Sequence, residues 1–172
     1  MATFPDPVSL RLERRLPGTI GQLWRYLTDS DLRARWLAAG PMLLVAGGAY
    51  EMTWDNAALS APGDEPPERF QDYTPTLRGR VLQCEPPHRL SFSWGEGEHA
   101  SEVTIQLQQV GEAVALELTH CALPFAALLV DAATGWHAHL DLLDDLLSHR
   151  APRSFWRDWR ELNHSYINLL TT

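Results

Sequence analysis

Hydrophobic and polar residues alternate in several short segments of the chain, which is the pattern of strands that bury one face. The first such segment is residues 8–16, where Leu10 and Leu12 alternate with Arg11 and Glu13. Turn residues later separate further segments at the spacing of an antiparallel meander. These four predicted strands are residues 76–85, 89–96, 101–110 and 113–120.

The sequence also predicts a β-hairpin before this meander. It consists of the apolar run 42–46, a turn at Gly47-Gly48 and the alternating segment 49–55. Residues 57–75 are rich in proline and acidic side chains, which predicts a long mobile loop inside the domain. Loops of this kind are solvated and can also gate a cavity. The acidic residues of the loop include Glu65, Glu68 and Asp72.

Apolar residues that recur every three or four positions predict two short helices after the first strand. Thr19 and Gln22 form a capping-box start for a helix over residues 20–28. A second short helix is predicted over residues 31–39, and Gly40-Pro41 is expected to end it.

A long helix is expected to begin near Gly135 and to place Trp136 and Leu140 on its apolar face. Three acidic side chains of this helix are expected to face water: Asp141, Asp144 and Asp145. The periodicity of residues 153–170 predicts an additional C-terminal helix that lies over the domain or over a second copy of it. Its apolar face consists of Phe155, Trp159, Leu162, Tyr166 and Leu169.

This order of elements predicts an α+β fold in which helices lie apart from an antiparallel sheet of six or seven strands. Seven flat strands would be ~34 Å wide, whereas one helix with its side chains measures ~10–12 Å across. The sheet must therefore curl around the long helix, and unfilled space between them becomes a pocket. We expect a single domain over residues 1–172, with a core over 8–149.

Composition limits the possible functions. The chain has 172 residues, of which 45% are apolar, so it can build one core without disulfides or metals. Its formal charge of −8 argues against a nucleic-acid partner. The sequence has no signal peptide or stretch long enough to span a membrane, which predicts a cytoplasmic protein without a membrane partner. Cys84 and Cys121 are far apart in sequence and are expected to be reduced thiols.

Several motifs resemble the SRPBCC or START-like superfamily, in particular its bacterial branch named after the activator of the heat-shock-protein-90 ATPase. The resemblance covers about residues 8 to 149. It rests on Trp24 in the first helix, Arg35-Trp36, the turn Pro86-Pro87-His88-Arg89-Leu90, and Gly135-Trp136. It implies a helix-grip fold with a deep hydrophobic cavity, but it transfers no catalytic motif residue by residue. Some relatives are cyclases or hydratases, and small bacterial members are regarded as binders.

Three tryptophans and their neighbours are the candidate ligand-binding residues. Trp54, Trp94 and Trp136 lie on apolar faces, where an indole N–H can orient a ligand, although periodic aromatic residues also simply pack in cores. The complete candidate set is Tyr50, Met52, Trp54, Phe92, Trp94, His120, Trp136 and Leu140.

His120 ends the last predicted strand, where it can act as an acid, a base or a ligand donor, or fill a purely structural place. His137 and His139 are two residues apart on a helix, so they point to different faces and do not form a paired metal site. No nucleotide-binding loop or nucleophile motif is present, so we expect neither a metal nor a cofactor.

Three functional hypotheses follow. The first is a protein that binds a hydrophobic or amphipathic small molecule between the sheet and the long helix. The second is an enzyme of the cyclase or hydrolase type that uses polar cavity groups such as His120. The third is a co-chaperone-like interaction module or homodimer that uses Trp156 and Trp159 of the C-terminal helix.

Overall fold

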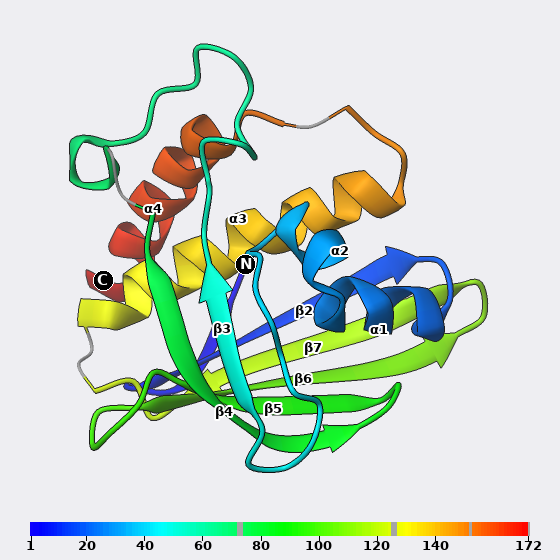
Figure 1. The fold of residues 1–172 in the computed structure, drawn as a ribbon. Coiled ribbons are helices and arrows are strands. Elements are labelled where there is room, and N and C mark those ends of the chain that lie inside the picture. Colours follow the sequence, from blue (N-terminus) through cyan, green and yellow to red (C-terminus); the bar gives the residue numbers. More distant parts are fainter. Residues whose placement is uncertain (72–73, 125–126, 152, 172) are drawn as a thin grey trace.

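Seven antiparallel strands form one curved sheet in the computed structural model, which describes residues 1–71, 74–124, 127–151 and 153–171. The spatial order of the strands is β1-β2-β7-β6-β5-β4-β3. Their bounds are β1 Thr3–Asp6, β2 Ser9–Pro17, β3 Ala49–Thr53, β4 Thr76–Glu85, β5 Arg89–Trp94, β6 Ser101–Val110 and β7 Ala113–Cys121. The predicted α+β fold with a helix-grip arrangement is confirmed (Figure 1).

Four α-helices and one short 3-10 helix accompany the sheet in the described part of the chain: α1 Ile20–Thr28, α2 Ser30–Ala34, η1 Glu68–Phe70, α3 Ala127–Leu147 and α4 Phe155–Thr171. The long helix α3 crosses the concave side of the sheet, with α1 and α2 near one of its ends and α4 packed against it (Figure 1). The predicted helix start at Thr19 is confirmed, because the Thr19 side chain accepts a hydrogen bond from the Gln22 backbone N–H. In the same way, the Asp29 side chain caps α2.

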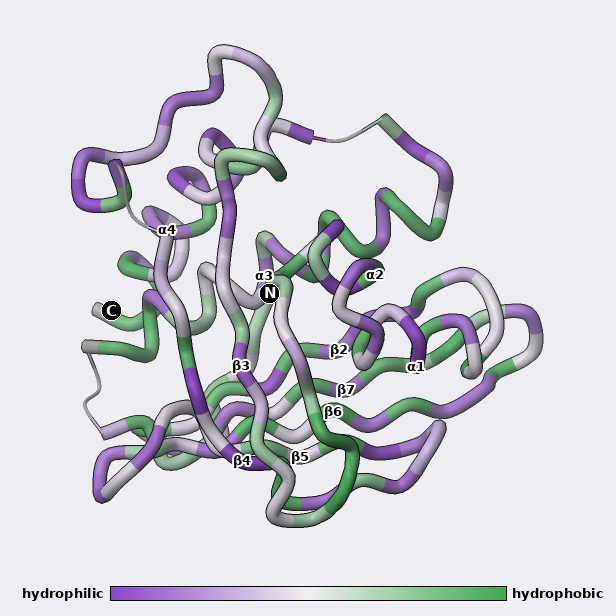
Figure 2. Tube along the Cα trace, in the orientation of Figure 1, coloured by the Kyte–Doolittle hydropathy of each residue, from purple (hydrophilic) through white to green (hydrophobic). Residues whose placement is uncertain are grey.

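The core lies where the alternating patterns place it. Every second residue of β7 is buried, and Val114, Leu116 and Leu118 belong to the core. β6 and β7 pair along their full lengths, so Ile105 lies opposite Leu118 and the two apolar faces coincide. Figure 2 shows hydrophobic and hydrophilic residues alternating along these strands. Since one face of each strand supplies the core, the concave side of the sheet is apolar.

One predicted strand is wrong. Residues 42–46 form a loop that touches β3 only through isolated bridges such as Met42 with Tyr50. The chain turns within this loop because the Val45 N–H bonds to the Leu43 carbonyl, and both side chains are more than half exposed, at 60% for Leu43 and 53% for Val45. Figure 2 shows the loop as a hydrophobic segment beside β3. The seventh strand is instead β1, which the sequence pattern did not indicate.

The long helix also differs from its prediction. α3 begins at Ala127, eight residues before the expected start at Gly135. Asp145 is buried rather than facing water, because it accepts hydrogen bonds from Arg150 and Arg153. The side-chain hydrogen bond from Arg153 lowers the pKa of Asp145.

α4 packs on α3 through Tyr166, which is buried. The Tyr166 hydroxyl accepts a hydrogen bond from the Ala2 backbone N–H at 2.7 Å and is hydrogen-bonded to His137 Nδ1 at 2.8 Å. These contacts join the first strand, α3 and α4. Leu169, which was expected on the same apolar face, is 51% exposed instead. The cysteines Cys84 and Cys121 are free thiols.

Candidate functional site

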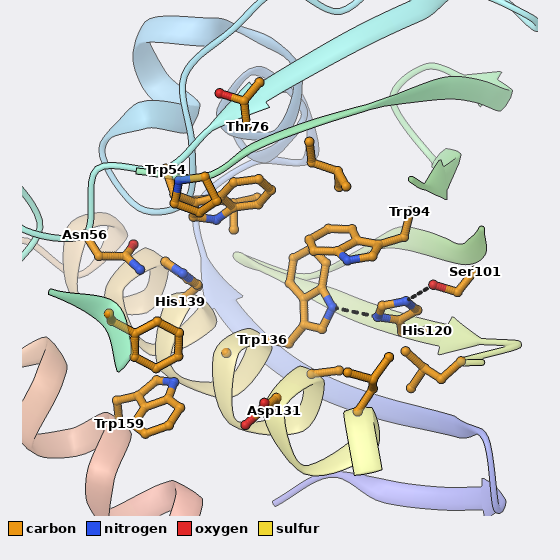
Figure 3. A pocket seen from close by; sticks show the side chains of 18 of the residues that line it. Trp54, Asn56, Thr76, Trp94, Ser101, His120, Asp131, Trp136, His139 and Trp159 are labelled. Carbon is orange, nitrogen blue, oxygen red and sulfur yellow. Dashed lines mark hydrogen bonds between the residues drawn. The ribbon is translucent and has the colours of Figure 1, made fainter. Parts of the chain in front are cut away.

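A cavity of about 490 Å³ lies between the concave side of the sheet, α3 and α4. Its walls come from β4 to β7, the first half of α3, the first turns of α4 and the loop between β3 and β4 (Figure 3). The volume falls in the range of about 300–1,000 Å³ that is typical of small-molecule sites. The sequence predicted that one helix is too narrow to cover the concave side of the sheet. The cavity lies in the space that the helix does not fill.

One wall of the cavity is a group of three tryptophans. Trp94 on β5 lies in the middle, with its ring centroid 5.6 Å from that of Trp54 and 5.1 Å from that of Trp136. Both ring pairs are inclined rather than parallel, at 63° and 57°. The three rings pack against one another and also line the cavity. They are therefore both part of the core and part of the pocket wall.

The opposite wall comes from α4 and the η1 segment. Phe70 stacks on Trp156 with ring centroids 5.4 Å apart and meets Trp159 edge-on at 5.2 Å. Phe155 contacts Trp156 at 4.9 Å and His139 of α3 at the same distance. Aromatic rings therefore enclose the cavity from two sides (Figure 3).

Gly135 opens space between these walls. It lies in the middle of α3 and lines the cavity, and a Cβ added there would meet no atom within 4 Å. A glycine inside a helix costs about 1 kcal/mol relative to alanine. The helix thus carries a destabilising residue where any side chain would enter the cavity.

His120 is the centre of a buried hydrogen-bond chain at the β6–β7 end of the cavity (Figure 3). The Trp136 indole N–H donates to His120 Nδ1 at 3.2 Å, and His120 Nε2 lies 2.8 Å from Ser101 Oγ. Burial lowers the pKa of His120 to about 4, so the ring is neutral at pH 7. Because an indole is only a donor, Nδ1 is the unprotonated nitrogen, and Nε2 carries the proton and donates it to Ser101.

This tautomer disfavours nucleophilic chemistry at Ser101. A histidine that activates a serine offers the hydroxyl an unprotonated nitrogen, and its other nitrogen donates to a carboxylate. His120 has the reverse arrangement, since its third partner Trp136 is a donor. Ser101 accepts from His120, so its own hydroxyl proton is available to an acceptor in the cavity.

The loop between β3 and β4 is docked on the helices that border the cavity. The Asp64 side chain accepts a hydrogen bond from the Trp156 backbone N–H at 2.8 Å, at the first turn of α4. Arg69 makes a two-pronged ion pair with Asp131 of α3, at 2.7 and 3.1 Å. The side chain of Arg160 also donates to the Glu65 carbonyl. The loop therefore has defined partners here, while the predicted acidic residue Asp72 lies outside the described residues.

Comparison with known families identifies the chain. Residues 18–148 match the family described as activator of Hsp90 ATPase homolog 1-like protein, abbreviated AHSA1. The chain belongs to this family. The resemblance drawn from the sequence is thereby confirmed, and AHSA1 and related SRPBCC proteins commonly bind hydrophobic ligands.

Several solved structures are similar to the chain in fold and sequence. The protein encoded by gene BPP1335 of Bordetella parapertussis is 39% identical, with a TM-score of 0.80, over 95% of this chain and 87% of that one. CalU16 from Micromonospora echinospora is 26% identical, with a TM-score of 0.68, over 95% and 88%. A Rhodobacter sphaeroides protein is 27% identical, with a TM-score of 0.63, over 87% and 98%. The curated proteins with which the chain was compared include no match.

Half of the candidate ligand-binding residues line the cavity. These four are Trp54, Trp94, His120 and Trp136. The other four are buried in the core and do not line it: Tyr50, Met52, Phe92 and Leu140.

Tyr50 illustrates why parity along a strand is insufficient to identify a pocket residue. Its ring lies over Gly79 of β4, where an added Cβ would come within 2.7 Å of the ring. Its hydroxyl donates to the Ser93 carbonyl at 2.5 Å, so the side chain is held against the sheet. A side chain on the inward face of the sheet can thus pack against a neighbouring strand and not line the cavity.

Sequence reasoning missed several polar residues of the cavity. Ser101 shares its parity with the buried Val103 and Ile105, so the strand pattern was sufficient to place it inward. Asn56 lies in the loop after β3, and Asp131 lies in the part of α3 that precedes the predicted helix start at Gly135. Neither position has a periodic pattern that indicates the direction of its side chain.

His139, another residue of the cavity wall, also has a structural contact. It donates from Nδ1 to the Trp36 carbonyl at 2.7 Å and so holds the segment after α2 against α3.

The described residues contain neither a group of metal-binding side chains nor a helix that can span a membrane. No three His, Cys, Asp or Glu side chains in these parts of the chain are grouped so that they can hold a metal ion. Among the same residues, no helix combines the length and the apolar character that crossing a membrane requires.

Two buried histidines and the half-buried His137 are expected to make stability depend on pH. Burial lowers the pKa of His120, His137 and His139 to about 4, against an ordinary value of about 6.5. Between these values the unfolded chain binds protons that the folded chain excludes, so the free energy of unfolding falls as pH drops from 6.5 toward 4. His120 and His139, which are buried, each contribute at most about 3 kcal/mol.

Urea denaturation at several pH values between 4.5 and 7.5 tests this expectation. This range stays above the region where the carboxylate of Asp145, whose pKa is lowered, becomes protonated. His139→Asn keeps a donor for the Trp36 carbonyl and removes one titrating ring, so its stability should vary less with pH than that of the wild type. An equal pH dependence in both proteins would contradict the assignment.

Proposed function

We propose that the protein binds a hydrophobic or amphipathic small molecule in the cavity between the sheet, α3 and α4. The observation that carries this proposal is the cavity of about 490 Å³ with aromatic rings on two sides. Membership of a family that commonly binds hydrophobic ligands supports it. Cytoplasmic location and a homodimer remain predictions from the sequence.

The two alternatives gain no comparable support. The protonated nitrogen of His120 faces Ser101, so this pair does not form the activated nucleophile that a hydrolase of the serine type needs. An interaction module was expected to expose Trp156 and Trp159, but both side chains are buried beside Phe70. Binding is therefore the function that the geometry favours.

Filling the cavity at Gly135 is expected to abolish binding without harming the fold. We use the uncharged fluorescent probe N-phenyl-1-naphthylamine, whose emission rises in apolar surroundings. Gly135→Phe places a ring where a Cβ meets no neighbour, and phenylalanine is a better helix former than glycine. We expect the affinity for the probe to fall at least about 10-fold while the melting temperature is unchanged or higher.

Gly21→Phe is the matched control. Gly21 lies in α1, is exposed and does not line the cavity, and an added Cβ there also meets no atom within 4 Å. This variant should bind the probe as the wild type does. If the wild type fails to bind the probe, or if Gly135→Phe binds it equally well, the cavity is not the binding site. Native mass spectrometry of protein from its own source is the direct route to the ligand itself.

A further inference from the structure

Two polar atoms in the cavity wall are buried and have no hydrogen-bond partner among the described residues. They are the indole Nε1 of Trp156, a donor, and the amide Oδ1 of Asn56, an acceptor. Both residues line the cavity, and the Trp156 side chain is only 4% exposed. Buried donors and acceptors in folded proteins almost always have partners. A donor and an acceptor that both remain unpaired at one cavity point to a ligand that pairs with them.

Packing holds both groups in place before any ligand arrives. Trp156 is stacked on Phe70, and its backbone N–H is bonded to Asp64. The Asn56 carbonyl accepts a hydrogen bond from Ser60 Oγ at 2.7 Å, which fixes the turn that carries its side chain. One loop therefore supplies Asn56 and also orients Trp156. Because these groups are already ordered, they lose little conformational entropy when a ligand binds.

The charges around the cavity favour an uncharged ligand. Asp131 is already paired with both terminal nitrogens of Arg69. His120 and His139 are neutral at pH 7, because burial lowers the pKa of each to about 4. The remaining titratable residue among the described lining residues is His99, which is exposed. A charged ligand group would thus lose its hydration without gaining a buried partner of opposite charge.

We propose that the natural ligand is uncharged, mostly apolar, and carries both a hydrogen-bond acceptor for Trp156 Nε1 and a donor for Asn56 Oδ1, as an amide does. This inference rests on the proposed function, and it names the ligand class. Ser101 provides a further donor at the opposite, His120 end of the cavity.

Three probes of nearly equal shape separate these features. Naphthalene-2-carboxamide has the acceptor and the donor, 2-acetylnaphthalene has only the acceptor, and naphthalene-2-carboxylate is charged. Isothermal titration of the full chain should find the carboxamide tightest. One neutral hydrogen bond corresponds to about a 3- to 10-fold change in affinity, so the ketone should be weaker by this factor. The carboxylate should be weaker by at least about 10-fold.

Two variants assign the contacts. Trp156→Phe keeps an aromatic ring but removes the N–H, so it should weaken the carboxamide and the ketone alike, by about 3- to 10-fold. Asn56→Leu should remove the difference between carboxamide and ketone. Trp24→Phe is the control for loss of a buried indole, because Trp24 is buried in α1 and does not line the cavity. Its affinities should equal those of the wild type.

The outcomes distinguish this inference from the proposed function. If ketone and carboxamide bind equally, or if the carboxylate binds most tightly, the ligand class is wrong while the cavity remains a binding site. If Trp156→Phe leaves all affinities unchanged in a protein with an intact melting transition, the role of Trp156 is refuted. If none of the three probes binds to the wild type although N-phenyl-1-naphthylamine does, only the ligand class is wrong. If that probe also fails to bind, the proposed function fails together with the inference.

Discussion

Phe155→Ala is expected to lower the free energy of unfolding by about 3–5 kcal/mol, the usual cost of removing a large aromatic side chain from a packed core. Phe155 is 1% exposed and lies between His139 of α3 and Trp156. Its removal leaves a void at the junction of α3, α4 and the cavity. Urea denaturation followed by circular dichroism measures the change.

Leu169→Ala is the matched control on the same helix. Leu169 is 51% exposed, so truncating it should change the stability by no more than about 0.5 kcal/mol. Equal losses in the two variants would contradict the packing of α4 on α3.

Deleting residues 153–172 removes Phe155 together with the buried Tyr166 and is expected to lower stability or solubility further. A truncated chain with an unchanged melting temperature would refute this expectation.

The second large effect is expected at Arg33, a charged residue that is only 1% exposed. Its guanidinium donates to four backbone carbonyls, at Leu27, Thr28, Ala38 and Gly40. Through these bonds it joins the end of α1 to the segment that follows α2. Desolvation lowers the pKa of Arg33, whereas the nearby Asp29 raises it.

Arg33→Met keeps an unbranched apolar stem but removes the guanidinium, so the carbonyls lose their donor. Each buried polar group left unpaired costs about 1–3 kcal/mol, and we expect a total loss of about 3–5 kcal/mol after partial rearrangement. Arg35→Met is the control, because Arg35 is exposed and makes a single 3.4 Å contact with the Tyr26 hydroxyl. Guanidinium chloride denaturation should find that only the Arg33 variant is strongly destabilised. Equal midpoints would show that the bonded carbonyls tolerate the change.

Most of the fold could be predicted because its information is local and periodic. A period of two marked β2 to β7, and a period of 3.6 marked α1, α4 and most of α3. The caps at Thr19 and Asp29 depend on residues within one turn of the chain. The error at residues 42–46 has the same origin, since an apolar run does not reveal whether a neighbouring strand is available to pair with it.

The candidate site was predictable only in part, because pocket membership is not a local property. Parity placed Trp94 and Tyr50 on one face of the sheet, but the approach of Gly79 decided that only Trp94 reaches the cavity. The periodicity of α4 marked Phe155 and Trp159, yet it did not show that they close one side of a cavity. Asn56 lies in a turn, where no periodic pattern indicates a direction.

The sequence by itself determined the α+β class, the curl of the sheet around a long helix, the family and a candidate set containing His120. These conclusions depend on patterning and on the widths of strands and helices, which hold in any fold of this kind. The tertiary structure alone decided the chemistry of the site. It brought the Trp136 N–H to His120, paired Arg69 with Asp131 and left Trp156 Nε1 without a partner among the described residues, because hydrogen bonding depends on distances between residues far apart in the chain.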